Sequence, residues 1–262
     1  MTEMPYVLSD AQVNQFHTNG FLALHQIADL DEIATMRTLY DDLFERRVGR
    51  EAGDHFDLAG ADDDGTPPAL EQILNPAHYA PEFKGLKCAQ GALSIATQLL
   101  GPGTESQGDH AILKPAGRGA ATPWHQDESY WNPTLSYNAL SVWMPLQEAT
   151  LENGCMHFIP GSHRFEVLPH HPINHDPRVH GLEVNEPVDE RLAVACPLVA
   201  GGATFHLART LHYAGENRTA MPRRAYIMMF GTPPTPFPGA RRFPWLEARQ
   251  TAREARAASG QA

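Results

Sequence analysis

The hydrophobic positions at the start of the chain follow a helical period. Ser9 and Gln12 match a Ser-x-x-Gln capping box, and Val13 and Phe16 follow at helical spacing. Gly20 stands where a glycine commonly ends a helix, because glycine adopts the left-handed backbone that such an end requires. The pattern therefore predicts a helix between Ser9 and Gly20.

Three further elements are predicted before residue 105. A short apolar strand is expected at 21–24, and Asp29 or Asp31 is expected to cap a second helix. Apolar residues in that helix recur at intervals of three and four, namely Leu30, Ile33, Met36, Tyr40 and Leu43. A third helix is expected over about 81–100. Between the last two helices, the acidic segment 49–68 is rich in glycine and proline and predicts a loop.

The pattern changes to short apolar segments over residues 106–235. Proline, glycine and asparagine separate these segments, which are HAILK, ALSVWMPL, CMHFIP, GATFHL and RAYIMMF. Such spacing is typical of an all-β sandwich or barrel, and no alternation of strands and helices is present. We therefore expect a single domain over 1–262, with a mostly helical N-terminal layer (1–105), a β-rich core (106–235) and a C-terminal tail (236–262).

Composition narrows the range of functions. The net charge of −11 argues against nucleic acid as a partner, because such binding usually requires a basic face. No apolar run reaches the roughly 18–20 residues that span a bilayer, and no signal peptide is recognised, so no membrane association is expected. The three cysteines form no CxxC motif, which favours a reducing, cytoplasmic location without disulfides or a thiolate zinc site.

The tail is an exception to the acidic balance, because arginines gather in it. We expect them to lie on the solvated face of an amphipathic helix. These residues are Arg241, Arg242, Arg249, Arg253 and Arg256.

The segment WHQDESYW contains a candidate metal site. On a strand, side chains two residues apart face the same side, so His125 and Asp127 are expected to bind one ion. A second histidine would complete the two-histidine, one-carboxylate triad of non-haem iron sites, which leaves coordination positions open for a keto acid and O₂. His212 is the best candidate for this ligand. His206 also lies in the preceding segment, and His110 shares a strand face with Lys114.

A buried cation is the second expected feature of the site. Arg223 begins the apolar segment RRAYIMMF, and an arginine there could bind the distal carboxylate of a keto acid through two hydrogen bonds. Arg224 is its neighbour. Because neighbouring residues of a strand face opposite sides, only one of the two arginines is expected to point inward.

Several ordered stretches together resemble the phytanoyl-CoA dioxygenase family over about residues 5–235. They are LSDAQVNQFHTNGFLAL, ILKPAGRGAATPWHQD, ALSVWMPLQEATLENGCMHFIPGSH, GGATFHLARTLHYAGEN and RTAMPRRA. The resemblance implies a mainly β fold with flanking helices around a double-stranded β-helix, the cupin-like jelly roll. It also implies a dioxygenase that uses Fe(II), 2-oxoglutarate and O₂, with small-molecule hydroxylation as the expected reaction and succinate and CO₂ as by-products.

The resemblance also assigns roles to individual residues. His125, Asp127 and His212 are implied as iron ligands, and Arg223 as the partner of the distal carboxylate of 2-oxoglutarate. Trp143 and Lys114 match residues that family members place near the cosubstrate, although core packing is an equal alternative for Trp143. Since the carboxylate Asp127 is present, oxygen insertion is favoured over halogenation.

Alternatives remain open on the sequence alone. The same cofactors could support desaturation, epoxidation or cyclisation, and the chain could instead be a cupin-type metalloenzyme or a non-catalytic ligand-binding jelly roll. Neither the substrate nor the oligomeric state is indicated. Segments 49–68 and 170–181 are candidate lids, because long loops in a compact domain often enclose ligands. Tyr130 and Trp131 could stack on a substrate or pack in the core.

Overall fold

The structure is a computed structural model that describes residues 6–63 and 65–259. Helix α1 (Asp10–Asn19) begins at the capping box of Ser9 and Gln12 and ends at Gly20, whose φ of 85° is left-handed. Strand β1 (Phe21–Leu24) follows, and helix α2 (Leu30–Glu45) begins at Asp29, whose side chain accepts a hydrogen bond from the Glu32 amide. These elements confirm the predictions from the capping residues and the apolar period.

The rest of the N-terminal layer differs from the prediction in two places. The segment 49–68 contains strand β2 (His55–Asp57), followed by β3 (Glu71–Leu74) and the short helix α3 (Pro76–Tyr79). The single helix expected over 81–100 is interrupted, because Leu86 is extended and separates a 3-10 helix (Pro81–Gly85) from α4 (Lys87–Leu100).

Two sheets face each other and form the jelly-roll core. The larger sheet has the strand order β1-β12-β7-β14-β4-β3-β2, and the smaller sheet has the order β11-β8-β13-β5. The remaining strands of these two sheets are β4 (Glu105–Lys114), β5 (Thr122–His125), β7 (Ala139–Pro145), β8 (Met156–Phe158), β11 (Val194–Cys196), β12 (Ala203–Leu207), β13 (His212–Ala214) and β14 (Arg223–Gly231).

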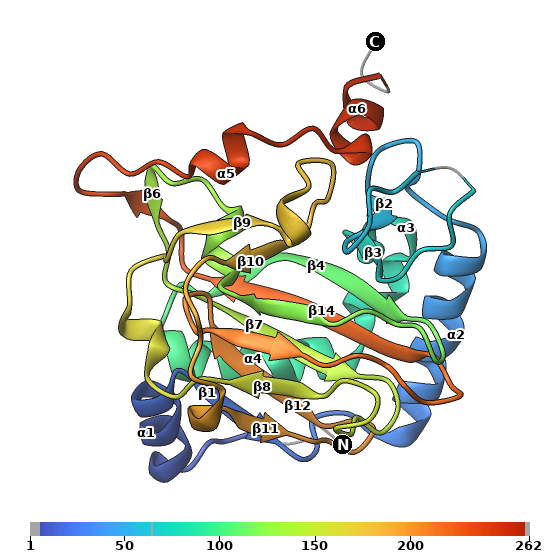
Figure 1. Cartoon of the computed structure of the whole chain (residues 1–262). Helices are drawn as coiled ribbons and strands as arrows, with labels where there is room; N and C mark the ends of the chain where they lie inside the picture. Colours follow the sequence, from blue (N-terminus) through green and yellow to red (C-terminus); the bar gives the residue numbers. More distant parts are fainter. Residues whose placement is uncertain (1–5, 64, 260–262) are drawn as a thin grey trace.

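Three strands of the larger sheet come from the N-terminal layer. β1 pairs antiparallel with β12, and β3 pairs antiparallel with β4 and β2. Helix α4 runs behind the larger sheet (Figure 1) and packs with α2 against its outer face. The layer is therefore not purely helical, because its chain also supplies both edges of the larger sheet.

Strand β7 shows how the alternation of side chains creates the site. All its residues are buried, but Leu140, Val142 and Met144 pack in the core beneath the helices. Ser141 and Trp143 point the other way, into the space between the two sheets. One strand thus supports the helical layer with one face and the cavity with the other.

Shorter elements surround the open end of the core. Strands β9 (His170–Pro172) and β10 (Leu182–Val184) pair with each other, so the segment 170–181 is not wholly irregular. Strand β6 (Leu135–Ser136) pairs with β15 (Thr235–Pro236), after which the tail forms helices α5 (Pro244–Glu247) and α6 (Ala252–Ser259). Among the described residues, no helix is both long and apolar enough to cross a membrane.

Candidate active site

A cavity of about 310 Å³ lies between the two sheets. His125, Asp127 and His212 line it, and their potential ligand atoms all lie within 4.8 Å of one another. His125 is the last residue of β5 and His212 the first of β13, and the two residues are directly paired across the smaller sheet. The structure therefore brings the three predicted ligands together.

Asp127 reaches the site by a different route from the one predicted. The strand ends at His125, and Asp127 begins a 3-10 helix (Asp127–Tyr130). The simple alternation of a strand therefore does not explain why His125 and Asp127 converge. The turn after Gln126 redirects the chain and places Asp127 Oδ1 3.6 Å from His125 Nε2 and 3.4 Å from His212 Nε2.

Backbone carbonyls fix the orientation of both histidine rings. The Nδ1 atom of His125 lies 2.8 Å from the carbonyl of Pro123, and that of His212 lies 2.8 Å from the carbonyl of Thr210. A carbonyl only accepts, so Nδ1 carries a proton in both rings, and each Nε2 is the nitrogen that would present its lone pair to a metal bound at the shared point. Two neutral imidazoles and one carboxylate are a donor set that suits ferrous iron.

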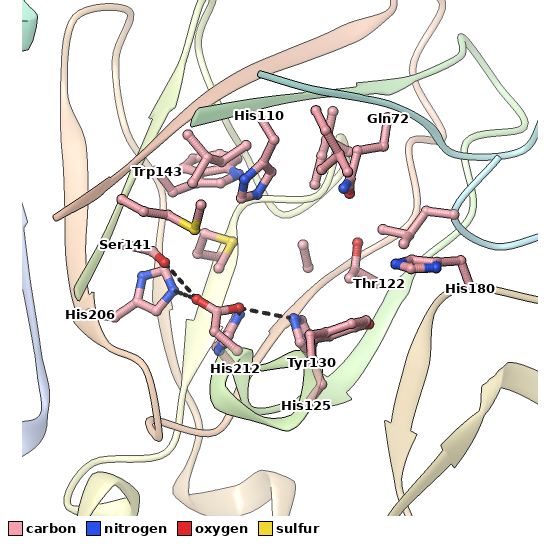
Figure 2. A pocket seen from close by; sticks show the side chains of 18 of the residues that line it. Gln72, His110, Thr122, His125, Tyr130, Ser141, Trp143, His180, His206 and His212 are labelled. Carbon is pink, nitrogen blue, oxygen red and sulfur yellow. Dashed lines mark hydrogen bonds and ion pairs between the residues drawn. The ribbon is translucent and has the colours of Figure 1, made fainter. Parts of the chain in front are cut away.

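The second carboxylate oxygen of Asp127 is held from the larger sheet. Ser141 Oγ donates a hydrogen bond of 2.6 Å to Oδ2, and His206 Nε2 lies 3.3 Å from the same atom, as Figure 2 shows. Burial would raise the pKa of Asp127, but the imidazoles around it outweigh burial and hold this pKa well below its usual value. Asp127 is therefore an anion at neutral pH.

Arg223 is buried in the cavity wall without a counter-ion among the described residues. Its exposed fraction is 1%, and its Nε and Nη1 atoms have no hydrogen-bond partner there. The guanidinium lies 5.4 Å from the ring centre of Trp143, and burial lowers its pKa to about 10, which leaves it charged. A buried, unpaired cation costs free energy, so this position suits the carboxylate of 2-oxoglutarate. Arg224 faces outward and pairs with Asp41, as the strand alternation predicts.

Lys114 lies outside this arrangement. It is fully buried, does not line the cavity, and its Nζ donates to three backbone carbonyls, those of Ala120, Ala214 and Gly215, at 2.7, 2.9 and 2.5 Å. All three protons of an ammonium group are thereby used. Lys114 thus ties chain segments together beside Arg223, its direct partner across β4 and β14, and its contact with the cosubstrate stays a prediction.

His110, Tyr130 and Trp131 all line the cavity. Burial lowers the pKa of His110 to about 4, so its ring is neutral beside Trp143 (Figure 2). Both candidate lids also contribute to the wall, through Leu58 and His180.

Other lining residues were not singled out from the sequence. Ser141 could have been noticed as a polar residue in an otherwise apolar strand, at an inward position. Gln72, Thr122, Arg249 and Arg253 carried no such signal, because their positions depend on how separate segments meet.

A jelly roll with this triad and an unpaired arginine between its sheets is the architecture of non-haem iron, 2-oxoglutarate-dependent oxygenases, and the enzyme is of this class. The chain belongs to the phytanoyl-CoA dioxygenase (PhyH) family, whose model matches residues 16–225. Family membership bears out the resemblance seen in the sequence. It also favours an oxygenase over a cupin-type metalloenzyme or a non-catalytic jelly roll.

Individual relatives agree with this assignment. The structure of EvdO2 from Micromonospora carbonacea var. aurantiaca is 43% identical, covers 93% of this chain and 99% of that chain, and superposes with a TM-score of 0.81. A second EvdO2 structure, complexed with 2-oxoglutarate, is 39% identical over the same shares with a TM-score of 0.79.

Sequence comparison adds further relatives, of which two are described. Phytanoyl-CoA dioxygenase domain-containing protein 1 of Danio rerio is 24% identical over 260 residues, covering 84% of this chain and 89% of that protein. The probable alpha-ketoglutarate-dependent hypophosphite dioxygenase of Stutzerimonas stutzeri is 27% identical over 169 residues, which cover 62% of this chain but only 57% of that protein.

Proposed function

We propose that His125, Asp127 and His212 bind the ferrous ion and that Arg223 and Trp143 bind 2-oxoglutarate, in an enzyme that hydroxylates a small organic molecule. One observation carries this proposal. The Nε2 atoms of the two histidines converge on one oxygen of Asp127, while a backbone carbonyl fixes the opposite nitrogen of each ring. This is the arrangement of a metal site whose ligands are oriented before the metal binds.

Each of the site residues has a distinct role in this proposal. Arg223 holds the distal carboxylate of 2-oxoglutarate through its free guanidinium nitrogens, and Trp143 covers the guanidinium. Ser141 holds one oxygen of Asp127 by a hydrogen bond and His206 lies beside the same oxygen, so that the other oxygen faces the two histidines. When bound, iron and 2-oxoglutarate supply the oxidising chemistry, in which O₂ is consumed and 2-oxoglutarate is converted to succinate and CO₂.

The remaining wall positions the substrate and excludes water. Residues from segments 49–68 and 170–181 and from the tail close the side of the cavity that the two sheets leave open. We also propose that residues 1–262 form one domain. The pairing of β1 and β3, which precede residue 105, with strands of the core supports this proposal.

The test is an anaerobic titration with Fe(II) and then with 2-oxoglutarate, in which the weak visible band of the chelate is recorded. Wild-type protein is expected to show the band, His212→Ala to lose it, and Arg223→Ala to require at least about tenfold more 2-oxoglutarate, since a charge-assisted hydrogen-bond pair is lost. Matched controls are His157→Ala, a histidine of β8 outside the cavity, and Arg224→Ala, the outward-facing neighbour. A metal-loaded wild type without the band would overturn the proposal.

A further inference from the structure

The C-terminal tail crosses the open end of the cavity and is anchored at several points. Trp245 Nε1 donates to the carbonyl of Ser129 at 2.9 Å, and the amide of Gln250 donates to the carbonyl of Pro177 at 2.9 Å. Beyond these, Arg256 pairs with Asp62. Figure 1 shows α5 and α6 along this edge, α5 above β9 and α6 above β2. The expectation of a solvated tail is therefore wrong for four of its five arginines, because the tail packs on the segments that enclose the cavity, and Arg242 alone among them is exposed.

The arginines of the tail fall into two groups. Arg241, Arg242 and Arg256 each form an ion pair with a carboxylate, provided by Glu128, Glu247 and Asp62. Arg249 and Arg253 line the cavity instead, and neither forms an ion pair with any residue in the described part of the chain. The Nε atom of each is buried and has no hydrogen-bond partner there.

Aromatic rings hold the two cavity arginines in place without neutralising them. The guanidinium of Arg249 lies 5.3 Å from the ring centre of Tyr130, and that of Arg253 lies 5.2 Å from the ring centre of Phe56. Arg249 donates one hydrogen bond, of 3.5 Å, to the carbonyl of His180. The two rings flank His180, whose ring centre lies 5.8 Å from that of Tyr130 and 4.8 Å from that of Phe56. The two cations therefore share one small region of the wall.

The described charged and titratable groups around this region form no direct ion pair with either arginine. Burial, and then the two arginines, lower the pKa of His180 well below its usual value, so this imidazole is neutral. Glu254 is close to both arginines but binds the hydroxyl of Thr251. Asp54 is close to Arg253 and accepts a hydrogen bond from Tyr79. Unpaired, partly buried guanidinium groups cost free energy, and an anionic ligand would recover it.

This region is distinct from the site of Arg223. The neighbours of Arg223 are Trp143 and Tyr40, whereas Tyr130, Phe56 and His180 surround the tail arginines. Much of the remaining wall is apolar and includes Leu58, Leu74, Ile112, Ile227 and Met229. A ligand that fills the space must therefore combine an apolar body with an anionic group.

We propose that the substrate is an organic anion, a carboxylate or a phosphate ester, whose charged group is bound by Arg249 and Arg253. The proposal rests on the proposed function, since it assumes that 2-oxoglutarate occupies the site of Arg223. It assigns substrate selection to two residues of the tail, which lies beyond the match to the family model at 16–225. The apolar body of the substrate would then extend from this end of the cavity toward the triad.

The test measures binding of simple probes by calorimetry to the anaerobic enzyme loaded with Fe(II) and 2-oxoglutarate. The probes are benzoate, phenyl phosphate and benzamide, the last being a neutral analogue of benzoate with nearly the same shape. At least one anion is expected to bind about tenfold more tightly than benzamide. The affinity for this anion is expected to fall about tenfold in Arg249→Gln and in Arg253→Gln. The preferred anion distinguishes a carboxylate substrate from a phosphate ester.

Two controls keep the result specific. Arg242→Gln removes an exposed tail arginine that is paired with Glu247 and should bind the anions like wild type. Arg249→Lys retains the positive charge but lacks the two parallel N–H donors of a guanidinium group. It should keep part of the anion preference, which a merely structural role would not predict. Equal binding of anions and benzamide, or unchanged binding in both glutamine variants, would overturn the inference. The chelate band, recorded on the same samples, separates these outcomes from failure of the proposed function, because only the latter abolishes the band.

Discussion

The hydroxyl of Ser141 donates a 2.6 Å hydrogen bond to Oδ2 of Asp127, the carboxylate oxygen that faces away from the paired histidines. His206 approaches the same oxygen at 3.3 Å. The other oxygen, Oδ1, lies 3.6 Å from His125 Nε2 and 3.4 Å from His212 Nε2. The two oxygens of this carboxylate thus have separate partners: residues of the larger sheet contact Oδ2, and residues of the smaller sheet lie near Oδ1.

Removal of the Ser141 hydroxyl should weaken iron binding while leaving the fold intact. In Ser141→Ala, Asp127 is free to rotate, so we expect the affinity for Fe(II) to fall about 10- to 100-fold, the usual effect of losing a group that orients a metal ligand. Anaerobic Fe(II) titration measures this change. Ser136→Ala, in β6, is the matched control. An unchanged Fe(II) affinity in Ser141→Ala would show that His206 alone orients the carboxylate.

Replacement of Arg223 by lysine should raise KM for 2-oxoglutarate by about tenfold or more. Lysine keeps the positive charge but cannot present two parallel N–H groups to a carboxylate, and it loses the planar contact with Trp143. Succinate release at varied 2-oxoglutarate concentration gives KM and kcat separately. Arg224→Lys, on the outer face of the same strand, should leave both unchanged. If Arg223→Lys also leaves KM unchanged, the cosubstrate carboxylate binds elsewhere.

Lys114→Met should destabilise the protein without changing its affinity for 2-oxoglutarate. Three buried carbonyls would lose their donor, and we expect the free energy of unfolding to fall by about 3 kcal/mol. Urea unfolding measures the stability, and KM for 2-oxoglutarate is measured below the unfolding temperature. A raised KM with normal stability would instead assign Lys114 to the cosubstrate, as the family resemblance implies.

His170 should make the protein less stable in mild acid. Its Nε2 accepts from the amide of Gln126 at 3.2 Å and its Nδ1 donates to the carbonyl of Leu168 at 2.7 Å, so the neutral ring is required. Burial lowers the pKa of His170 to about 4, against about 6.5 in the unfolded chain. Between these values the unfolded chain binds a proton that the folded chain does not, and stability falls as pH falls.

Because of His170, the free energy of unfolding is expected to fall by about 1.4 kcal/mol for each unit that the pH falls between about 6.5 and 4. Above that range this residue makes stability no more dependent on pH. Urea unfolding at several pH values measures the slope, with a chelator present so that proton-linked metal binding does not contribute. His170→Gln should show a shallower slope than wild type. Identical slopes would mean that His170 is already protonated in the folded protein.

Local signals in the sequence were sufficient for the first three elements, α1, β1 and α2. Ser9, Gln12 and Gly20 mark the two ends of α1 because capping depends on groups a few residues apart. The interruption at Leu86 could not be predicted this way, because the apolar pattern continues through it. Nor could the pairing of β3 with β4, since it depends on contacts between segments distant in the chain.

The candidate site was predictable only where residue type restricts chemistry. Histidine and aspartate in the spacing of His125 and Asp127 suggested a metal, although Asp127 lies on a turn and not on the strand. Arg223 was predicted to point inward, and the outward pairing of Arg224 agrees. Arg249 and Arg253 were expected to be solvated, because nothing in an amphipathic pattern shows which surface the helix will cover.

The course of the tail bears on how the substrate specificity of the enzyme can change. The triad lies on two strands and a 3-10 helix within the match to the family model, whereas Arg249 and Arg253 lie on a segment that reaches the cavity only by packing across its rim. A graft that exchanges the chain after Gly231 would therefore replace both tail arginines. It would also remove the contacts of Arg241 with Glu128 and of Trp245 with Ser129, in the 3-10 helix that begins at Asp127. Substrate selection and the placement of Asp127 thus depend on one segment, so a change of specificity made in the tail must keep the residues that anchor this 3-10 helix.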